Sequence, residues 1–336
     1  MGEMIGKQSV KFVEAPYIFE GASVVGPKEG EGPLGKLFDV IEQDPMLGSK
    51  SWEEAESLLQ KETVQKLLLK SGLKKEDIRY IFAGDLLGQL IATTFGIMDY
   101  EIPFMGLYGA CSTMGEGLSL AAMMVAAGYG ENVIAMASSH FGSAERQFRF
   151  PLEYGNQRPF SATWTVTGCG AAIVTKRKGF ARITGVTTGK IIDYGVKDAQ
   201  NMGACMAPAA ADVIYNHLND FGTAPDDYDK IITGDLGYVG QAILIDLLKR
   251  KGIDISKVHM DCGIEMFDKE NQDTHSGGSG CGCSATVLTS YVFKQLKKKA
   301  WKKILFIPTG ALMSPISFNQ GKSVPGIAHL VVIESV

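Results

Sequence analysis

The segment 109–140 holds the residue best suited to chemistry, Cys111. Cys111 immediately precedes an apolar, small-residue stretch over 113–127 that predicts a buried helix, and an apolar strand over 133–137 follows. A cysteine at a helix N-terminus lies beside unpaired backbone N–H groups, which stabilise the thiolate and lower the thiol pKa. Because free cysteines are also among the most buried residues, two interpretations stay open. Cys111 is either an activated nucleophile at the mouth of a pocket or a small buried side chain in a helix-start turn.

The same order of helix, strand and turn occurs twice in the chain. Residues 73–87 align with 223–237 at an offset of 150, and the segment that begins at Ala110 aligns with the one that begins at Gly282 at an offset of 172. Self-similarity on this scale indicates two copies of one α/β unit. Alternating strands and helices favour mixed, largely parallel sheets that are covered by helices.

These alignments predict a layered α-β-α-β-α fold with two pseudo-duplicated halves. The predicted boundaries are 1–178 for the half that carries Cys111 and 179–336 for the second half. The cysteine helix and its counterpart over 285–296 would be sandwiched between the two sheets, because both are apolar.

Asp85 and Asp235 end equivalent strands of the two halves. Asp side chains after a strand commonly accept hydrogen bonds from the backbone of the next turn. Since both halves carry a copy, we expect a structural role for both residues, such as capping the following turn, rather than acid–base chemistry.

The composition excludes several classes of function. The chain of 336 residues has a net charge of -4, which argues against nucleic acid as a partner. None of its six cysteines forms a Cys-x-x-Cys pair, so we predict no metal site, no cofactor and a reduced, cytoplasmic setting. The N-terminus lacks the apolar segment of a signal peptide, and the longest apolar run, 118–127, is shorter than the roughly 20 residues that span a bilayer.

A duplicated α/β unit with a cysteine at the start of its first buried helix resembles the thiolase superfamily, which includes thiolases and β-ketoacyl synthases. Long peptides from about Gly6 to Glu334 also resemble the stage V sporulation protein AD family of spore-forming bacteria. The peptides are GPKEGEGPLG, KSWEEAE, AGDLL, GACST, SSHFGSAERQFRFPLEYG, TVTGCGA, MAPAAADVI, DYDKIITGDL, GGSGCGCSA, TGALMSP and IAHLVVIE. Because they are long and occur in order, the resemblance is specific.

The resemblance implies a thiolase-like fold and a homodimer. It also implies binding of dipicolinic acid (pyridine-2,6-dicarboxylic acid), with or without calcium, and a role in moving this ligand into the developing spore and releasing it at germination. In that role the protein would be the soluble part of a membrane channel complex with other stage V sporulation protein A subunits. It would lie in the cytoplasm or at the periphery of the spore inner membrane.

Thiolase-type catalysis needs partners for the cysteine. A base must activate the thiol, and two donors, usually His/His or His/Asn, must hold an oxyanion. His259 and His329 are the candidate partners of Cys111, but the residues around them do not match the superfamily patterns, and the turn 277–285 contains no Asn. We therefore expect binding rather than turnover. The alternative is an acyltransferase of the thiolase or β-ketoacyl-synthase type that uses Cys111.

A flat aromatic dianion needs charge-assisted donors and an apolar wall. Helix starts at Cys111 and Cys283 would offer backbone N–H groups to a carboxylate. The segment that follows the cysteine unit supplies cationic and polar side chains, namely His140, Arg146, Arg149, Tyr154 and Arg158. Arg146 and Arg149 would share a face of a helical turn. The alternative for these arginines is a surface cluster of ion pairs or a dimer contact.

Overall fold

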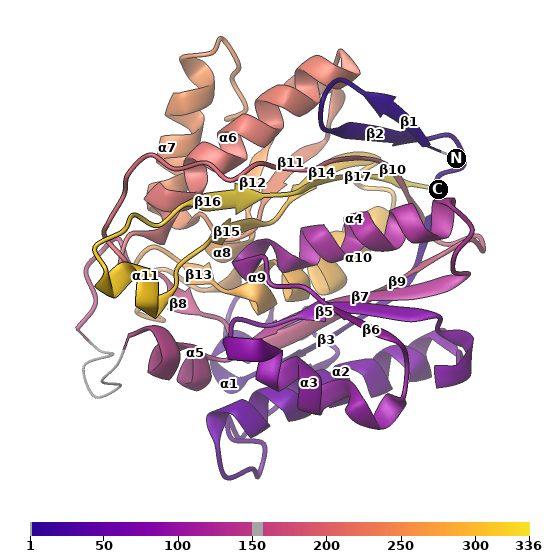
Figure 1. Cartoon of the computed structure of the whole chain (residues 1–336), viewed down its shortest axis with the longest axis horizontal. Coiled ribbons are helices and arrows are strands. Elements are labelled where there is room, and N and C mark those ends of the chain that lie inside the picture. Colours follow the sequence, from indigo (N-terminus) through magenta and orange to yellow (C-terminus); the bar gives the residue numbers. More distant parts are fainter. Residues whose placement is uncertain (1, 150–156) are drawn as a thin grey trace.

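The computed structural model describes residues 2–149 and 157–336. Helices and sheets alternate through five layers (Figure 1). The helices, from one outer layer through the central layer to the other outer layer, are α6 (Met202–Phe221) and α7 (Gly237–Lys249), α4 (Thr113–Ala126) and α9 (Cys281–Val287), and α2 (Trp52–Ser71) and α3 (Ile91–Ile97). The predicted α-β-α-β-α arrangement is confirmed.

The two sheet layers join at one edge into a single sheet of 13 strands, and each layer contains five strands in an equivalent order. In the first the order is β3 (Tyr17–Val25), β9 (Gly168–Thr175), β7 (Asn132–Ser139), β5 (Tyr80–Gly84) and β6 (Phe104–Gly106). In the second it is β10 (Ala181–Thr187), β17 (Leu330–Ser335), β14 (Lys303–Ile307), β11 (Lys230–Thr233) and β12 (His259–Asp261). Both sheets are mixed, since β5 and β11 pair in parallel with both neighbours, whereas β9 and β17 are antiparallel to theirs.

The repeat is visible in the boundaries of the elements. Helices α2 and α6 are both 20 residues long at an offset of 150, and each ends at a left-handed glycine, Gly72 or Gly222. Tyr80 pairs with Val133 in the first half, and Lys230 pairs with Ile304 in the second. Strand pairing therefore matches Val133 with Ile304. The offset of 172 predicts Leu305, one residue later.

Smaller elements complete the fold. A hairpin of β1 (Gly2–Ile5) and β2 (Ser9–Phe12) extends the sheet at β10, and β4 (Val40–Ile41) pairs with β3. Two short pairs are β8 (Trp164–Thr165) with β13 (Gly278–Ser279) and β15 (Thr309–Ala311) with β16 (Gly326–Ala328). The remaining helices are α1 (Pro27–Gly30), α5 (Phe141–Phe148), α8 (Cys262–Met266), α10 (Phe293–Lys297) and α11 (Pro315–Asn319).

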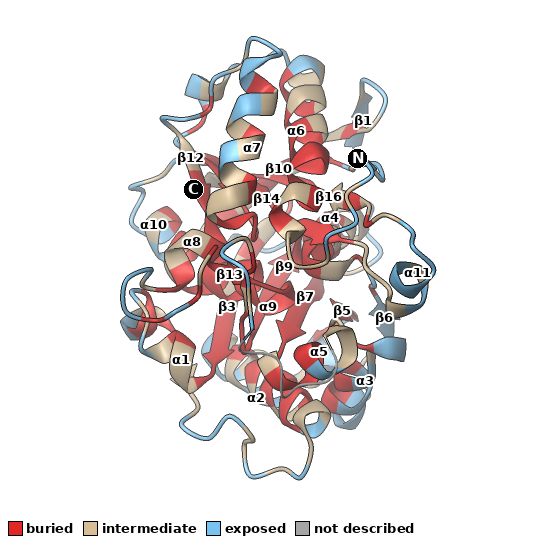
Figure 2. Ribbon diagram, turned by 90° about the vertical axis from the view of Figure 1, so that its left-hand side faces the viewer, coloured by how far each residue is buried: buried red, intermediate tan, exposed pale blue. Residues whose placement is uncertain are grey.

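The buried residues concentrate in the two sheets and the central helices, whereas the outer helices are exposed on one side (Figure 2). Small residues let the central layer pack closely. A Cβ on Gly170 of β9 would lie 2.3 Å from the carbonyl carbon of Ala285 in α9, so only glycine fits there. Among the described residues, no helix has both the length and the apolar character that crossing a membrane requires.

Candidate functional site

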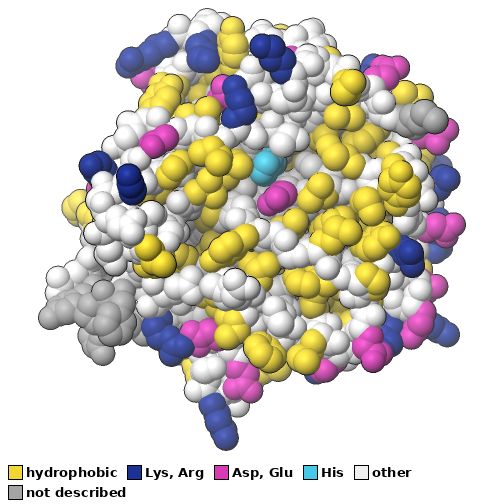
Figure 3. Space-filling view, in the orientation of Figure 1, with side chains coloured by type: hydrophobic (Ala, Val, Ile, Leu, Met, Phe, Trp, Pro, Cys, Tyr) yellow, Lys and Arg dark blue, Asp and Glu magenta, His cyan; other side chains and the backbone are white. Residues whose placement is uncertain are grey.

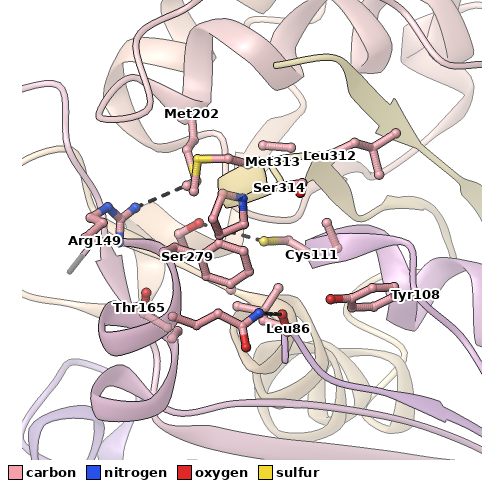
Figure 4. A pocket seen from close by; sticks show the side chains of 17 residues that line it. Leu86, Tyr108, Cys111, Arg149, Thr165, Met202, Ser279, Leu312, Met313 and Ser314 are labelled. Atoms are coloured by element: carbon pink, nitrogen blue, oxygen red, sulfur yellow. Dashed lines mark hydrogen bonds between the residues drawn. The ribbon is translucent and has the colours of Figure 1, made fainter. Parts of the chain in front are cut away.

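Cys111 lies at the wall of a cavity of about 310 Å³ between the two halves of the fold. It belongs to a short 3-10 turn, Ala110–Ser112, that leads directly into α4. The opposite walls come from the end of α5, from β8, from β13 and from the segment 311–315 (Figure 4). Most of these walls are apolar, with Phe148, Met202, Leu312 and Met313 among the lining side chains.

A buried carboxylate, Asp235, lies behind the Cys111 end of the cavity. Its Oδ2 accepts hydrogen bonds from Ser279 Oγ (2.6 Å) and Gly280 N (3.0 Å), and its Oδ1 accepts from Thr309 Oγ1 (2.8 Å). The Cys111 sulfur lies 4.0 Å from Ser279 Oγ, the hydroxyl group that donates to this carboxylate. Among the described residues, the polar groups nearest the cysteine are therefore the Ser279 hydroxyl and the Asp235 carboxylate behind it, and no histidine lines the cavity.

This environment disfavours the thiolate. Burial raises the pKa of the Cys111 thiol well above its usual value, and the negative charge of Asp235 adds to the effect. The Gly280 N–H favours the thiolate, but it is outweighed. The lowered pKa expected from a helix start is therefore wrong for this cysteine. Cys111 combines features of both interpretations of the sequence, since it lines a cavity and remains a buried, protonated thiol.

Arg149 lines the cavity on the side away from Cys111 (Figure 4). Its Nη1 forms an ion pair with Glu145, a buried residue one turn earlier, and its Nη2 lies 3.9 Å from the sulfur of Met202. Burial raises the pKa of the Glu145 carboxyl, while Arg149 opposes that shift. Among the described residues that line the cavity, Arg149 is the one cationic side chain.

Three other predicted ligand contacts do not line this cavity. His140 is the N-cap of α5: its Nδ1 accepts from Gly142 N (3.1 Å), and its Nε2 lies 2.7 Å from the carbonyl oxygen of Pro45. Arg146, three positions before Arg149, forms an ion pair with Glu53 instead. Cys283 is fully buried with its sulfur 3.6 Å from the Gly234 carbonyl oxygen.

His259 and His329, the predicted partners of Cys111, do not line the cavity either. His259 Nε2 lies 3.0 Å from Thr233 Oγ1, and its Nδ1 lies 3.0 Å from Gln241 Nε2. His329 Nδ1 accepts from Gly189 N at 3.4 Å. Burial lowers the pKa of both imidazoles to about 4, so both are neutral near pH 7.

Arg158 is not among the residues that line the cavity, because it stacks over Trp164 and donates to Asp273. Tyr154 lies outside the described residues. Conversely, Asp235, Ser279 and Thr309 were missed as site residues. Their positions in the repeat could have indicated them. Asp235 follows strand β11, and Ser279 lies just before helix α9, which is the counterpart in the second half of the helix that follows Cys111.

Comparison with known proteins agrees with this geometry. The family model described as stage V sporulation protein AD matches residues 6–334. Stage V sporulation protein AD of Bacillus subtilis (strain 168) is 42% identical over 332 residues, which cover 99% of this chain and 98% of that protein. The chain belongs to the stage V sporulation protein AD family. Membership of the stage V sporulation protein AD family supports a role in sporulation.

Solved structures show the fold that this member of the stage V sporulation protein AD family adopts. It is similar to 3-oxoacyl-[acyl-carrier-protein] synthase III from Aquifex aeolicus VF5, with a TM-score of 0.59 and 13% identity over 95% of this chain and 99% of that chain. It is also similar to the Acat5 thiolase from Ascaris suum, solved with coenzyme A, with a TM-score of 0.59 and 11% identity over 96% and 100% of the two chains. The fold is thiolase-like, as predicted.

Proposed function

We propose that the chain binds dipicolinic acid in the Cys111 cavity and supports its transport into the developing spore and its release at germination, as the soluble part of a membrane channel complex. The observation that carries this proposal is the combination of Arg149 with apolar walls in a cavity whose cysteine is held as a thiol. The volume of about 310 Å³ is at the small end of the roughly 300–1,000 Å³ typical of ligand sites.

The cavity suits a flat ring with a carboxylate at one end. Phe148 and Met313 offer apolar surface to ring faces, and the Arg149 guanidinium offers the paired donors that a carboxylate prefers. Among the described residues, the weakly accepting sulfur of Met202, at 3.9 Å, is the hydrogen-bond partner of Arg149 Nη2, and a carboxylate would be a stronger one.

Calorimetry tests the proposal. Pyridine-2,6-dicarboxylate should give saturable heat, whereas pyridine-3,5-dicarboxylate, with its carboxylates moved along the ring, should bind much more weakly. Arg149→Met should weaken binding by about 100-fold, because it removes a buried charged donor. Arg146→Met is the matched control, since Arg146 faces Glu53 and should leave the affinity unchanged. Equal heats for the two isomers would overturn a specific site.

An acyltransferase that uses Cys111 is the second candidate, and the position of the thiol on a cavity wall at a helix start favours it. Against it, no described histidine lines the cavity, and Asp235 raises the pKa of the thiol. Intact-mass measurement after incubation with acetyl-CoA should therefore show no adduct. An adduct that disappears in Cys111→Ala would support acyl transfer instead.

We also propose that a second copy of this chain pairs at strand β6, an edge strand whose three residues are all exposed. Apolar side chains crowd the face that Figure 3 shows, and most charged groups lie toward its margins. The exposed apolar residues near this edge are Ile91, Phe95, Met98, Phe104, Met105 and Tyr108. An unpaired edge strand beside such a patch is a template for pairing with another chain.

The oligomeric state tests this second proposal. Light scattering after size exclusion should give the mass of a dimer, and Met105→Lys should give a monomer, because it places a charge in the paired edge. Leu69→Lys is the matched control: Leu69 is 76% exposed on α2 and does not belong to β6. A monomeric wild-type protein would contradict the proposal.

A further inference from the structure

The two ends of the Cys111 cavity differ in electrostatic character. At one end Arg149 presents a guanidinium to the interior. At the other end Cys111, Ser279 and Gly280 form the wall, and the Asp235 carboxylate lies directly behind them. A ligand group that contacts Ser279 or Gly280 therefore contacts a residue that donates a hydrogen bond to the buried Asp235 carboxylate.

Burial raises the pKa of Asp235, whereas its hydrogen bonds lower it and fit an ionised carboxylate. The groups that donate to it are the hydroxyl groups of Ser279 and Thr309 and the Gly280 N–H. The Thr309 hydroxyl accepts from the Asp235 N–H, so its own proton is free for the carboxylate. An acceptor-only group matches this set of donors.

A second acid lies behind the first. Asp261 accepts from Leu236 N and Gly237 N, the two residues that follow Asp235, and the two carboxylates repel each other. No lysine or arginine is among the described residues that line the cavity, apart from Arg149 at the far end. The Cys111 end therefore offers hydrogen bonds but no compensating positive charge, and an added anion there would be poorly screened.

We infer that Asp235 is a specificity-determining residue, which restricts the cavity to ligands that place a single negative charge at the Arg149 end and an uncharged group at the Cys111 end. This inference rests on the proposed function and deepens it. A pyridine dicarboxylate would then bind best in the form that carries one proton on its second carboxyl group. Ser279 and Cys111 would contact that neutral group.

Calorimetry near neutral pH with two ligands of nearly equal shape tests the inference. Pyridine-2,6-dicarboxylate carries two charges, and 6-carbamoylpyridine-2-carboxylate carries one. The wild-type protein should bind the amide at least about tenfold more tightly, which corresponds to about 1.4 kcal/mol. Asp235→Asn should abolish this preference. Asp85→Asn, the equivalent change in the first half and outside the cavity, should keep the wild-type ratio.

The outcomes are distinguishable. If the wild-type protein binds the dicarboxylate as tightly as the amide, the inference is overturned while dipicolinate binding stands. If it binds neither ligand, both the proposed function and the inference are overturned. The wild-type comparison decides the question even when Asp235→Asn does not fold. An Asp235→Asn protein that folds, as judged by its thermal unfolding, and keeps the preference for the amide would assign the selectivity to another group and overturn the inference.

Discussion

Asp85 and Asp235 end equivalent strands, yet their side chains do different things. Asp85 accepts from Leu87 N (2.8 Å) and from the backbone and hydroxyl groups of Thr93 (2.8 and 2.6 Å), all within eight residues of itself. Asp235 accepts from Ser279, Gly280 and Thr309, which are more than 40 residues away in the sequence. The expected capping role is therefore confirmed for Asp85 and wrong for Asp235.

A second aspartate, Asp261, explains why Asp235 does not cap its own turn as Asp85 does. Asp261 at the end of β12 accepts from Leu236 N and Gly237 N and so caps the turn after β11. In the first half no described side chain other than Asp85 accepts from Leu87 N, the corresponding turn residue. Because Asp261 accepts the hydrogen bonds of this turn, Asp235 is free to accept from Ser279 and Gly280, which line the cavity. A duplicated residue therefore keeps its position in a fold without keeping its partners.

Replacing the two aspartates by asparagine should differ most in its effect on the reactivity of Cys111. Asp235→Asn removes the negative charge beside the thiol, which should lower the thiol pKa and speed alkylation at neutral pH by about ten- to a hundredfold. Asp85→Asn should leave the rate unchanged, because its partners lie outside the cavity. Intact-mass measurement during iodoacetamide treatment gives the rates, and Cys111→Ala identifies the site.

Two results would break this comparison. A similar acceleration in Asp85→Asn would show that loosening of the fold, rather than the local charge, controls the thiol. An unchanged rate in Asp235→Asn would show that burial alone holds the thiol protonated, since burial is the larger cause of the raised pKa of Cys111.

Much of the fold was predictable from the sequence, because helix and strand periodicity and the repeat are local or additive signals. The offset of 150 reproduces α2 and α6 along their whole length. The register at β14 was wrong by one residue, since pairing with β11 and β17, which no local pattern encodes, fixes it. Cys111 was correctly placed before a buried helix for the same local reason.

The site was less predictable, because its polar groups meet only through tertiary packing. Asp235, Ser279 and Thr309 come from three segments, and nothing local distinguishes Asp235 from Asp85. Arg149 and Arg146 look alike in the sequence, but a difference of three positions places one at the cavity and pairs the other with Glu53. Which arginine faces inward depends on how α5 packs against α2, and only the structure shows that.

A smaller effect should come from the buried acid Glu56, which lies near Asp85 and makes the free energy of unfolding depend on pH. Glu56 lies near Asp85, whereas the position 150 residues later is apolar Met206. Burial, together with the charge of Asp85, raises the pKa of Glu56 to about 8, from an ordinary value near 4.5 in the unfolded chain. The native state therefore binds more protons between these two values, and the free energy of unfolding should fall as the pH rises through this range.

Glu56→Gln should remove part of that slope, because an amide keeps a partner for the hydroxyl groups of Ser138 and Ser143 without titrating. Urea unfolding near pH 5 and near pH 9 measures the effect, and the variant should lose less stability than the wild-type protein between the two conditions. Glu54→Gln, on the same helix and exposed to solvent, is the control and should keep the wild-type slope. Equal slopes for Glu56→Gln and the wild-type protein would mean that the buried acid next to Asp85 does not titrate in this range. The two halves would then differ only in where their aspartates point, and not in what surrounds them.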